Sequence, residues 1–221
     1  MKVPRLLLSF TLVAVCLSVV LLMNIPAWLK YKKGDIRDYN LAQAGELQVG
    51  DLVKGTVNMT LGPCAEEYKT KYGVRTSDKS SKIYYVLWMD SNQLIVYETG
   101  NAEEYQTLDK LMNETESYFE SLSEANELGD MSVVTLPTTS MPIEGRVTEL
   151  PDEVRTHFKS LYDNVFGDDD FASETEPVMI TRIKLDSLTT QVLIGAGVGV
   201  LALGLLIATI VVWRRSKKYG Y

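Results

Sequence analysis

Two residues of this sequence have the side chains of a catalytic pair. Cys64 is the only cysteine outside the long apolar segments at the chain ends, and His157 is the only histidine. A histidine beside a cysteine can take the thiol proton and so activate the sulfur as a nucleophile. Cys64 is equally compatible with a thiol that pairs between molecules or with a buried apolar residue. His157 is equally explained as a solvent-exposed residue on a helix rich in charged side chains. The pair defines one alternative, a thiol-dependent membrane-bound hydrolase or transferase, but the sequence favours a protein that is not an enzyme.

Other signatures of catalysis or cofactor binding are missing. One histidine and one central cysteine cannot assemble a Cys/His zinc set or a two-cysteine redox motif. The motifs S-x-x-K, G-x-S-x-G and H-E-x-x-H do not occur in the sequence. The glycine-rich run from Gly195 to Gly199 lies in an apolar segment and lacks the lysine that follows in a phosphate-binding loop. We therefore expect no cofactor.

One acidic cluster has the ligand type that calcium prefers. Asp168, Asp169 and Asp170 are followed closely by Glu174 and Glu176, and hard cations bind several carboxylate oxygens. The cluster lacks the spaced ligands and the glycine of an EF-hand loop. A solvated acidic loop explains it more simply, so the three aspartates are the candidate metal ligands in a protein for which no metal is expected.

Charge is distributed very unevenly along the chain. Residues 30–189 contain 16 basic residues and all 29 acidic ones, a formal charge of −13. Because a nucleic-acid binder needs a basic surface, this acidity excludes nucleic acid as the partner. The acid is concentrated on one predicted helix, residues 102–128, where it favours either a solvated face or a basic protein partner.

Two long apolar segments lie at the two ends of the sequence. Residues 6–29 and 190–213 contain no charged residue, and each is long enough to cross a bilayer as a helix. The first begins like a secretory signal, but Asn24 to Trp28 is a poor cleavage site, so we expect a retained signal anchor. The second ends at Trp213 before a basic stretch, which is a stop-transfer pattern. The lipid bilayer is therefore the first expected partner.

Small residues in the second apolar segment predict close helix packing. Gly195 and Gly199 form a G-x-x-x-G motif, and Gly204 and Ala208 repeat the same spacing. Small residues four apart let helix backbones approach closely in lipid. The motif predicts packing against the first helix or against a second copy of the chain. The alternative is that glycine is simply common in membrane helices.

Two spans place both termini on one side of the membrane. Basic residues near the spans are equally numerous on the two sides, six on each. The signal-like start and the basic tail decide the orientation, with residues 1–5 and 214–221 cytoplasmic and residues 30–189 extracytoplasmic.

Hydropathy patterns predict an α+β domain with a mainly antiparallel sheet between the two spans. A hairpin of 83–89 and 93–99 precedes a long amphipathic helix over 102–128. Asn101 is expected to cap this helix, with Glu104 reaching back to the cap as in a capping box, and Gly129 to end it. A shorter helix begins at Pro151 and is expected to carry Val165 inward. Further strands are expected at four places, with Gly62-Pro63 ending the first of them: 53–61, 131–136, 143–147 and 178–185.

Several short motifs resemble a known family. They are Val53-Lys54-Gly55-Thr56-Val57, the segment Pro63 to Tyr68, the segment Tyr84 to Trp88, and Gly145-Arg146-Val147. Together they look like an uncharacterised family of two-spanning membrane proteins of Gram-positive bacteria. The resemblance implies a bacterial cell membrane, and it implies no activity and no functional residue.

The leading hypothesis is a membrane-tethered extracytoplasmic module that binds a membrane or envelope protein. Both ends are anchored, and nothing in the central region assembles a reaction centre. A third alternative is an accessory subunit of a membrane complex, packed through the helix that contains Gly195 and Gly199. A homo-oligomer held by that helix is a related possibility.

Overall fold

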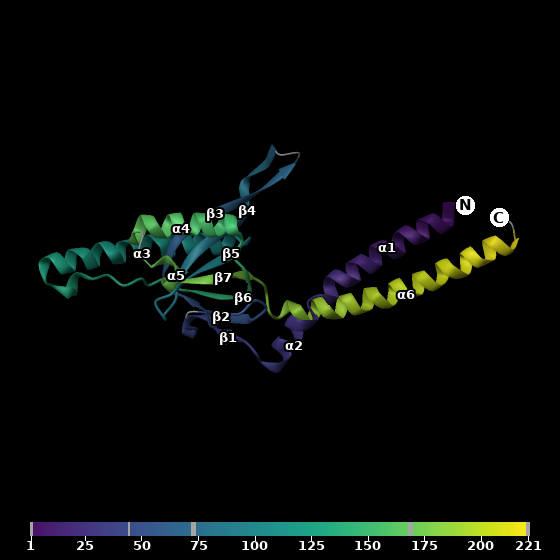
Figure 1. The fold of residues 1–221 in the computed structure, drawn as a ribbon, viewed down its shortest axis with the longest axis horizontal. Helices are drawn as coiled ribbons and strands as arrows, with labels where there is room; N and C mark the ends of the chain where they lie inside the picture. The colour runs from purple at the N-terminus through teal and green to yellow at the C-terminus, as the bar shows by residue number, and fades with distance from the viewer. Residues whose placement is uncertain (1, 44, 72–73, 168–169, 220–221) are drawn as a thin grey trace. The chain divides into compact units, whose positions relative to one another are not determined.

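The computed structural model describes residues 2–43, 45–71, 74–167 and 170–219. The chain forms two compact units, one of Met1–Asp35 with Lys184–Tyr221 and the other of Ile36–Ile183. Two long apolar helices at the chain ends pack together, and a mixed sheet with a long helix lies between them in sequence (Figure 1). The predicted α+β class is therefore confirmed.

The first unit contains the apolar helices. α1 (Lys2–Leu22) and α6 (Ser187–Tyr219) lie side by side, and α2 (Ile25–Lys33) follows α1 after a turn (Figure 1). The segments Leu7–Lys33 and Ser187–Arg215 are long and apolar enough to span a membrane. α2 ends at Gly34, whose φ of 71° is the left-handed conformation that glycine adopts without strain.

Glycines bring α1 and α6 into close contact. The Ser18 hydroxyl donates a hydrogen bond of 3.0 Å to the Gly195 carbonyl. A Cβ at Gly195 would lie 2.8 Å from the Cβ of Leu21, and one at Gly199 would lie 2.8 Å from the Ser18 Oγ. Larger residues at these two positions would therefore push the helices apart.

The second pair of small residues in α6, Gly204 and Ala208, does not face α1. A Cβ at Gly204 would meet no atom within 4 Å, and Ala208 is exposed. At the other end of the helix pair, the Asn24 amide donates a 2.8 Å hydrogen bond to Gln191. The Tyr31 hydroxyl donates to the Asp186 carboxylate. Hydrogen bonds therefore join the two helical segments at the end near Asn24 and Tyr31. Gly204 and Ala208 lie on the outer surface of the helix pair.

The second unit contains a seven-stranded sheet in the order β1-β2-β6-β7-β5-β4-β3. The pairs β1-β2 and β5-β7 are parallel and the other four are antiparallel. The strands are β1 (Arg37–Asp38), β2 (Leu52–Val57), β3 (Thr60–Lys71), β4 (Val74–Trp88), β5 (Leu94–Thr99), β6 (Met141–Glu149) and β7 (Thr175–Arg182). A short 3₁₀ turn, Tyr39–Leu41, follows β1.

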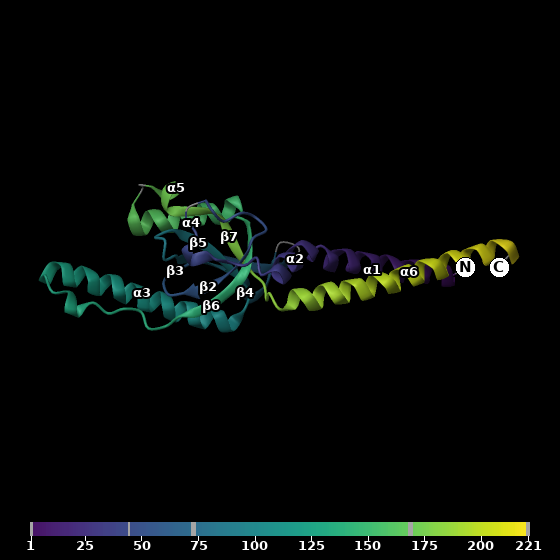
Figure 2. The same ribbon diagram turned by 90° about the horizontal axis from the view of Figure 1, so that it is seen from below.

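Helices cover both faces of this sheet. α3 (Ala102–Leu128) packs on the face that contains Tyr85 and Leu87, and α4 (Asp152–Phe166) packs on the face that contains Tyr84 and Val86 (Figure 2). Successive side chains of a strand point to opposite faces. The nearly continuous apolar run of β4 is therefore explained by burial on both sides. A short helix, α5 (Phe171–Glu174), precedes β7.

The first strand of the domain is shorter than predicted. β2 ends at Val57, and β3 begins at Thr60 and continues through Gly62 and Pro63, so the prediction that these two residues end a strand is wrong. Thr60 causes this break between two strands. Its hydroxyl donates a 2.6 Å hydrogen bond to the Val86 carbonyl, and its amide donates a 3.2 Å hydrogen bond to the Thr115 hydroxyl of α3. These bonds fix a new strand beside β4, and Gly62 accommodates the bulge with a φ of 97°.

The predicted strand over 131–136 is also wrong. A 3₁₀ turn, Met131–Val133, is followed by irregular chain that returns along α3. The Glu114 carboxylate accepts 2.8 Å hydrogen bonds from the amides of Thr138 and Thr139, and a 2.6 Å bond from the Thr139 hydroxyl. These bonds lower the pKa of Glu114 to about 2. The helix therefore supplies the partners that a sheet would otherwise provide.

The N-terminus of α3 is held on the sheet by Glu104. The Asn101 side chain caps the helix, as predicted, by accepting from the Glu103 amide at 3.2 Å. Glu104 was expected to reach back to the cap amide, but its carboxylate instead accepts from Tyr97 (2.9 Å), Thr99 (2.7 Å), the Asn101 amide group (3.2 Å) and Arg182. Burial raises the pKa of Glu104, but these hydrogen bonds outweigh it, and the net shift is downward.

Replacing Glu104 by alanine is expected to destabilise the protein by about 3 kcal/mol, because the half-buried Arg182 guanidinium and the buried Tyr97 hydroxyl lose their acceptor. The measurement is urea unfolding of the full chain in detergent, with Glu103→Ala as an exposed control from the same helical turn. The folded pKa of Glu104 lies below its ordinary value of 4.5. The difference should therefore be complete above that pH and shrink as the pH falls below it. Equal stability of the two variants would contradict this role.

Candidate functional site

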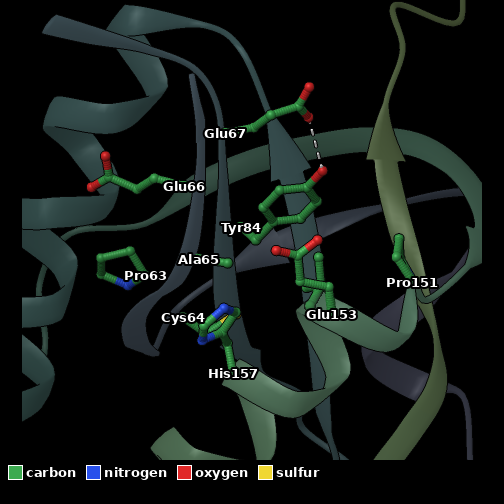
Figure 3. Close-up of a pocket in the computed structure, with 10 residues that line it drawn as sticks. Pro63, Cys64, Ala65, Glu66, Glu67, Tyr84, Pro151, Glu153 and His157 are labelled. Atoms are coloured by element: carbon green, nitrogen blue, oxygen red, sulfur yellow. Dashed lines mark hydrogen bonds between the residues drawn. The ribbon is translucent and has the colours of Figure 1, made fainter. Parts of the chain in front are cut away.

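Several grooves open on the Ile36–Ile183 unit, and two of them are candidate functional sites. The first contains both candidate catalytic residues. This groove, called the thiol groove, has a volume of about 570 Å³ and lies between β3, β4 and the start of α4 (Figure 3). Its polar lining consists of Cys64, Glu66, Glu67, Tyr84, Glu153 and His157. The fold therefore brings together two residues that are far apart in the sequence.

The geometry of Cys64 and His157 does not activate the thiol. The imidazole lies in front of Cys64 (Figure 3), but no hydrogen bond joins the two side chains among the described contacts. His157 is exposed, and Cys64 is half-buried. Burial raises the pKa of the Cys64 thiol to about 12. The reactive thiolate is therefore disfavoured at neutral pH.

Two of the three carboxylates that line the thiol groove, Glu66 and Glu67, already accept hydrogen bonds from neighbouring hydroxyls. Glu66 accepts from Ser80 at 2.5 Å and also from Tyr68, and Glu67 accepts from Tyr84 at 3.4 Å. No group of three or more His, Cys, Asp or Glu side chains in the described part of the chain is placed to hold a metal ion.

The candidate calcium loop is only partly described. Asp168 and Asp169 lie outside the described residues. Asp170 has a φ of 67° at the start of α5, where its carbonyl accepts from the amides of Ser173 and Glu174. Glu174 accepts a 2.6 Å hydrogen bond from the Tyr162 hydroxyl, and Glu176 accepts from the Gly45 amide at 3.1 Å. These last two carboxylates are therefore engaged in separate parts of the fold.

The pH dependence of alkylation tests the state of Cys64. In a Cys16→Ser chain, the rate of Cys64 alkylation by iodoacetamide should rise about tenfold per pH unit and not level off before about pH 11, because only the thiolate reacts. The rate is followed by mass spectrometry. A Cys64→Ser chain with Lys79→Cys supplies an exposed control, whose rate should level off above the ordinary thiol pKa of about 8.5. A plateau for Cys64 near neutral pH would indicate an activated thiol.

The second groove is more apolar and lies beside α3. This α3 groove has a volume of about 670 Å³. It is lined by Thr60, Leu61, Met112, Thr115, Glu116, Phe119, Glu120, Val165 and Phe166. Trp88 packs against two of its aromatic residues, with ring centroids 5.5 Å from Phe119 and 5.6 Å from Phe166. Aromatic rings held by one another form a rigid apolar surface.

Val165 shows why this groove is open. The helical pattern of α4 predicts that Val165 faces inward, but it is 50% exposed, so that prediction is wrong. It shares a stripe with the buried Val154, Phe158 and Tyr162, but lies in the last turn of the helix, where the sheet no longer covers it. Val165 therefore lines the α3 groove.

Acidic residues border the groove and continue beyond it. Glu116 and Glu120 line the groove, and Glu124 and Glu127 follow on the exposed surface of the same helix. These four glutamates are called the acidic stripe. No described lysine or arginine forms an ion pair with them; the nearest pair on the helix joins Lys110 to Glu114 at 3.6 Å. An apolar groove with an acidic border has the chemistry to hold an apolar segment flanked by basic residues.

The sequence analysis did not predict the α3 groove. The lengths of the predicted helix and of the strand before it nevertheless contained a signal for it. α3 has 27 residues and β5 has 6. At about 1.5 Å per residue in a helix and 3.3 Å in a strand, α3 is about twice as long as that strand. The apolar stripe of α3 is therefore longer than β5, the strand that precedes it in the sequence, and Phe119 lines the groove.

The fold and grooves define a class of protein. It has one α+β domain with candidate binding grooves, inserted between two helices long and apolar enough to span a membrane. The chain belongs to the family described as Domain of unknown function (DUF8577), which matches residues 3–213. No curated protein matches the chain. No solved structure matches it either.

Proposed function

We propose that the protein is a membrane-tethered binding module whose α3 groove holds a segment of a membrane or envelope protein. The observation that carries the proposal is the combination of an aromatic, apolar groove with an acidic border. The partner segment has apolar side chains that fill the groove, and lysine or arginine side chains that meet Glu116 and Glu120.

The membrane assignment is supported by the two apolar helices and the residues that flank them. Arg214 and Arg215 follow α6's apolar stretch, as in cytoplasmic flanks of membrane helices. The proposed topology places both termini in the cytoplasm and the Ile36–Ile183 unit outside the cell. The sequence resemblance to two-spanning proteins of Gram-positive bacteria supports a bacterial cell membrane as the location.

Binding is favoured over the two alternatives by specific contacts. The thiol-enzyme alternative requires a thiolate, and burial holds the Cys64 pKa near 12. The accessory-subunit alternative uses Gly195 and Gly199, but both glycines face α1 of the same chain. The α3 groove is not occupied by any part of its own chain among the described residues, so it remains available to a partner.

Trp88 provides a direct test of the groove. In a Trp28→Phe, Trp213→Phe chain, Trp88 is the only tryptophan, and it contacts both phenylalanines of the groove. An amphipathic leucine-lysine peptide should change its fluorescence saturably in nanodiscs of zwitterionic lipid. The isomeric leucine-glutamate peptide should not. Glu116→Lys with Glu120→Lys should weaken binding about tenfold by removing charge complementarity.

Glu103→Lys with Glu149→Lys gives the matched control, since both residues are exposed and lie outside the groove. This control should bind the peptide like the parent chain. Equal binding of the lysine and glutamate peptides, or equal weakening by both pairs of substitutions, would refute the proposed site.

A further inference from the structure

The β3-β4 hairpin projects from the sheet as a two-stranded arm. β5 pairs with β4 only from Ile83 to Trp88, so the earlier part of β4 has β3 as its strand partner. Figure 1 shows this hairpin extending beyond the remaining strands. The arm is defined as residues 68–71 and 75–80. A two-stranded ribbon without a third strand is only marginally stable in water, so the extension needs a reason beyond the fold of the sheet.

The arm has the opposite charge to the rest of the domain. Lys69, Lys71, Arg75 and Lys79 lie within eleven residues that contain one acidic residue, Asp78. The rest of residues 30–189 contains 12 basic and 28 acidic residues. The four basic side chains are exposed. The Arg75 guanidinium also lies over the Tyr68 ring, 3.2 Å from its centroid, which stiffens the arm.

The acidic stripe on α3 is unfavourable for its own helix. Glu116, Glu120 and Glu124 are spaced four residues apart, and like charges at this spacing destabilise a helix. Glu124 and Glu127 also lie near the C-terminus of α3, whose last turn contains no basic residue, although the helix dipole favours cations there. Local conflicts of this kind are characteristic of residues selected for binding.

One chain cannot bring its own arm to its own stripe. Within the Ile36–Ile183 unit, the C-terminal half of α3 and the arm extend away from opposite ends of the sheet (Figure 1). The two surfaces are complementary in charge and similar in extent, four cations against four glutamates. A second copy supplies a surface of opposite charge to each.

We propose that the arm of one copy docks on the acidic stripe of a second copy. The inference rests on the proposed function only for Glu116 and Glu120, the acidic border that both sites share, because the polar arm docks by charge and does not fill the apolar α3 groove. Each copy has one arm and one stripe, so the contact is head-to-tail and links copies in a row. Tethering in one membrane raises the effective concentration of the copies.

Charge reversal and its rescue test the inference in the full chain. Donor- and acceptor-labelled copies are reconstituted in zwitterionic vesicles, and energy transfer between copies is measured. Reversing the arm (Lys69→Glu, Lys71→Glu, Lys79→Glu) or the stripe (Glu116→Lys, Glu120→Lys, Glu124→Lys) should each weaken self-association about tenfold. High salt should weaken the parent in the same way.

Rescue separates docking from misfolding. A chain with both reversals should regain self-association, and so should a mixture of the arm-reversed and stripe-reversed chains. Reversing Glu103, Glu149 and Glu153, which are exposed and lie off the stripe, should leave self-association unchanged. Absence of energy transfer in the parent, or loss without rescue, overturns the inference.

Other outcomes identify other occupants. Arm-dependent binding to vesicles of anionic lipid, with no rescue by the reversed stripe, would show that the arm binds lipid and would overturn docking between copies. If self-association fails while the leucine-lysine peptide still binds at Glu116 and Glu120, the proposed function stands and only this inference falls. If the peptide fails to bind but the charge rescue succeeds, the copies dock without using the apolar groove.

Discussion

The Glu104 carboxylate fixes the position of α3, and the proposed binding surface follows from that position. It accepts hydrogen bonds from β5, from the helix cap and from Arg182 at the end of β7. Thr115, three turns later, makes a second attachment by accepting from the Thr60 amide. The first half of the helix is held at these two points, and its residues after Thr115 contribute Phe119 to the groove and provide the acidic stripe.

Coverage of the sheet on both faces explains why the grooves lie where they do. α3 buries Tyr85 and Leu87, while α4 buries Tyr84 and Val86 on the opposite face. β3 is the edge strand of the sheet and is in contact with both helices. Each groove therefore forms beside β3: the thiol groove next to the start of α4, and the α3 groove next to its last turn. In the first, Glu66 and Glu67 already accept hydrogen bonds from hydroxyls, whereas the second is the more apolar groove and the proposed binding surface.

Local signals predicted the elements whose partners are close in sequence. The Asn101 cap and Gly129 set the bounds of α3, and Asp90 to Asn92 set the turn between β4 and β5. Predictions failed where a distant residue supplied the bond: Thr115 starts β3 at Thr60, and Glu114 holds the segment that was expected to be a strand. The meeting of Cys64 and His157 in one groove, and the aromatic contacts of Trp88, likewise depend on pairings that periodicity does not encode.

The central claim is that the folded unit faces the outside of the membrane, where its groove and arm meet protein partners. The most direct test places one thiol on the arm, with Lys79→Cys in a Cys16→Ser, Cys64→Ser chain, because Lys79 is exposed whereas Cys64 is half-buried. Intact cells are treated with a membrane-impermeant maleimide and compared with lysed cells. Labelling in intact cells is the expected result. Labelling only after lysis would place the arm, the stripe and the groove in the cytoplasm and would contradict the account.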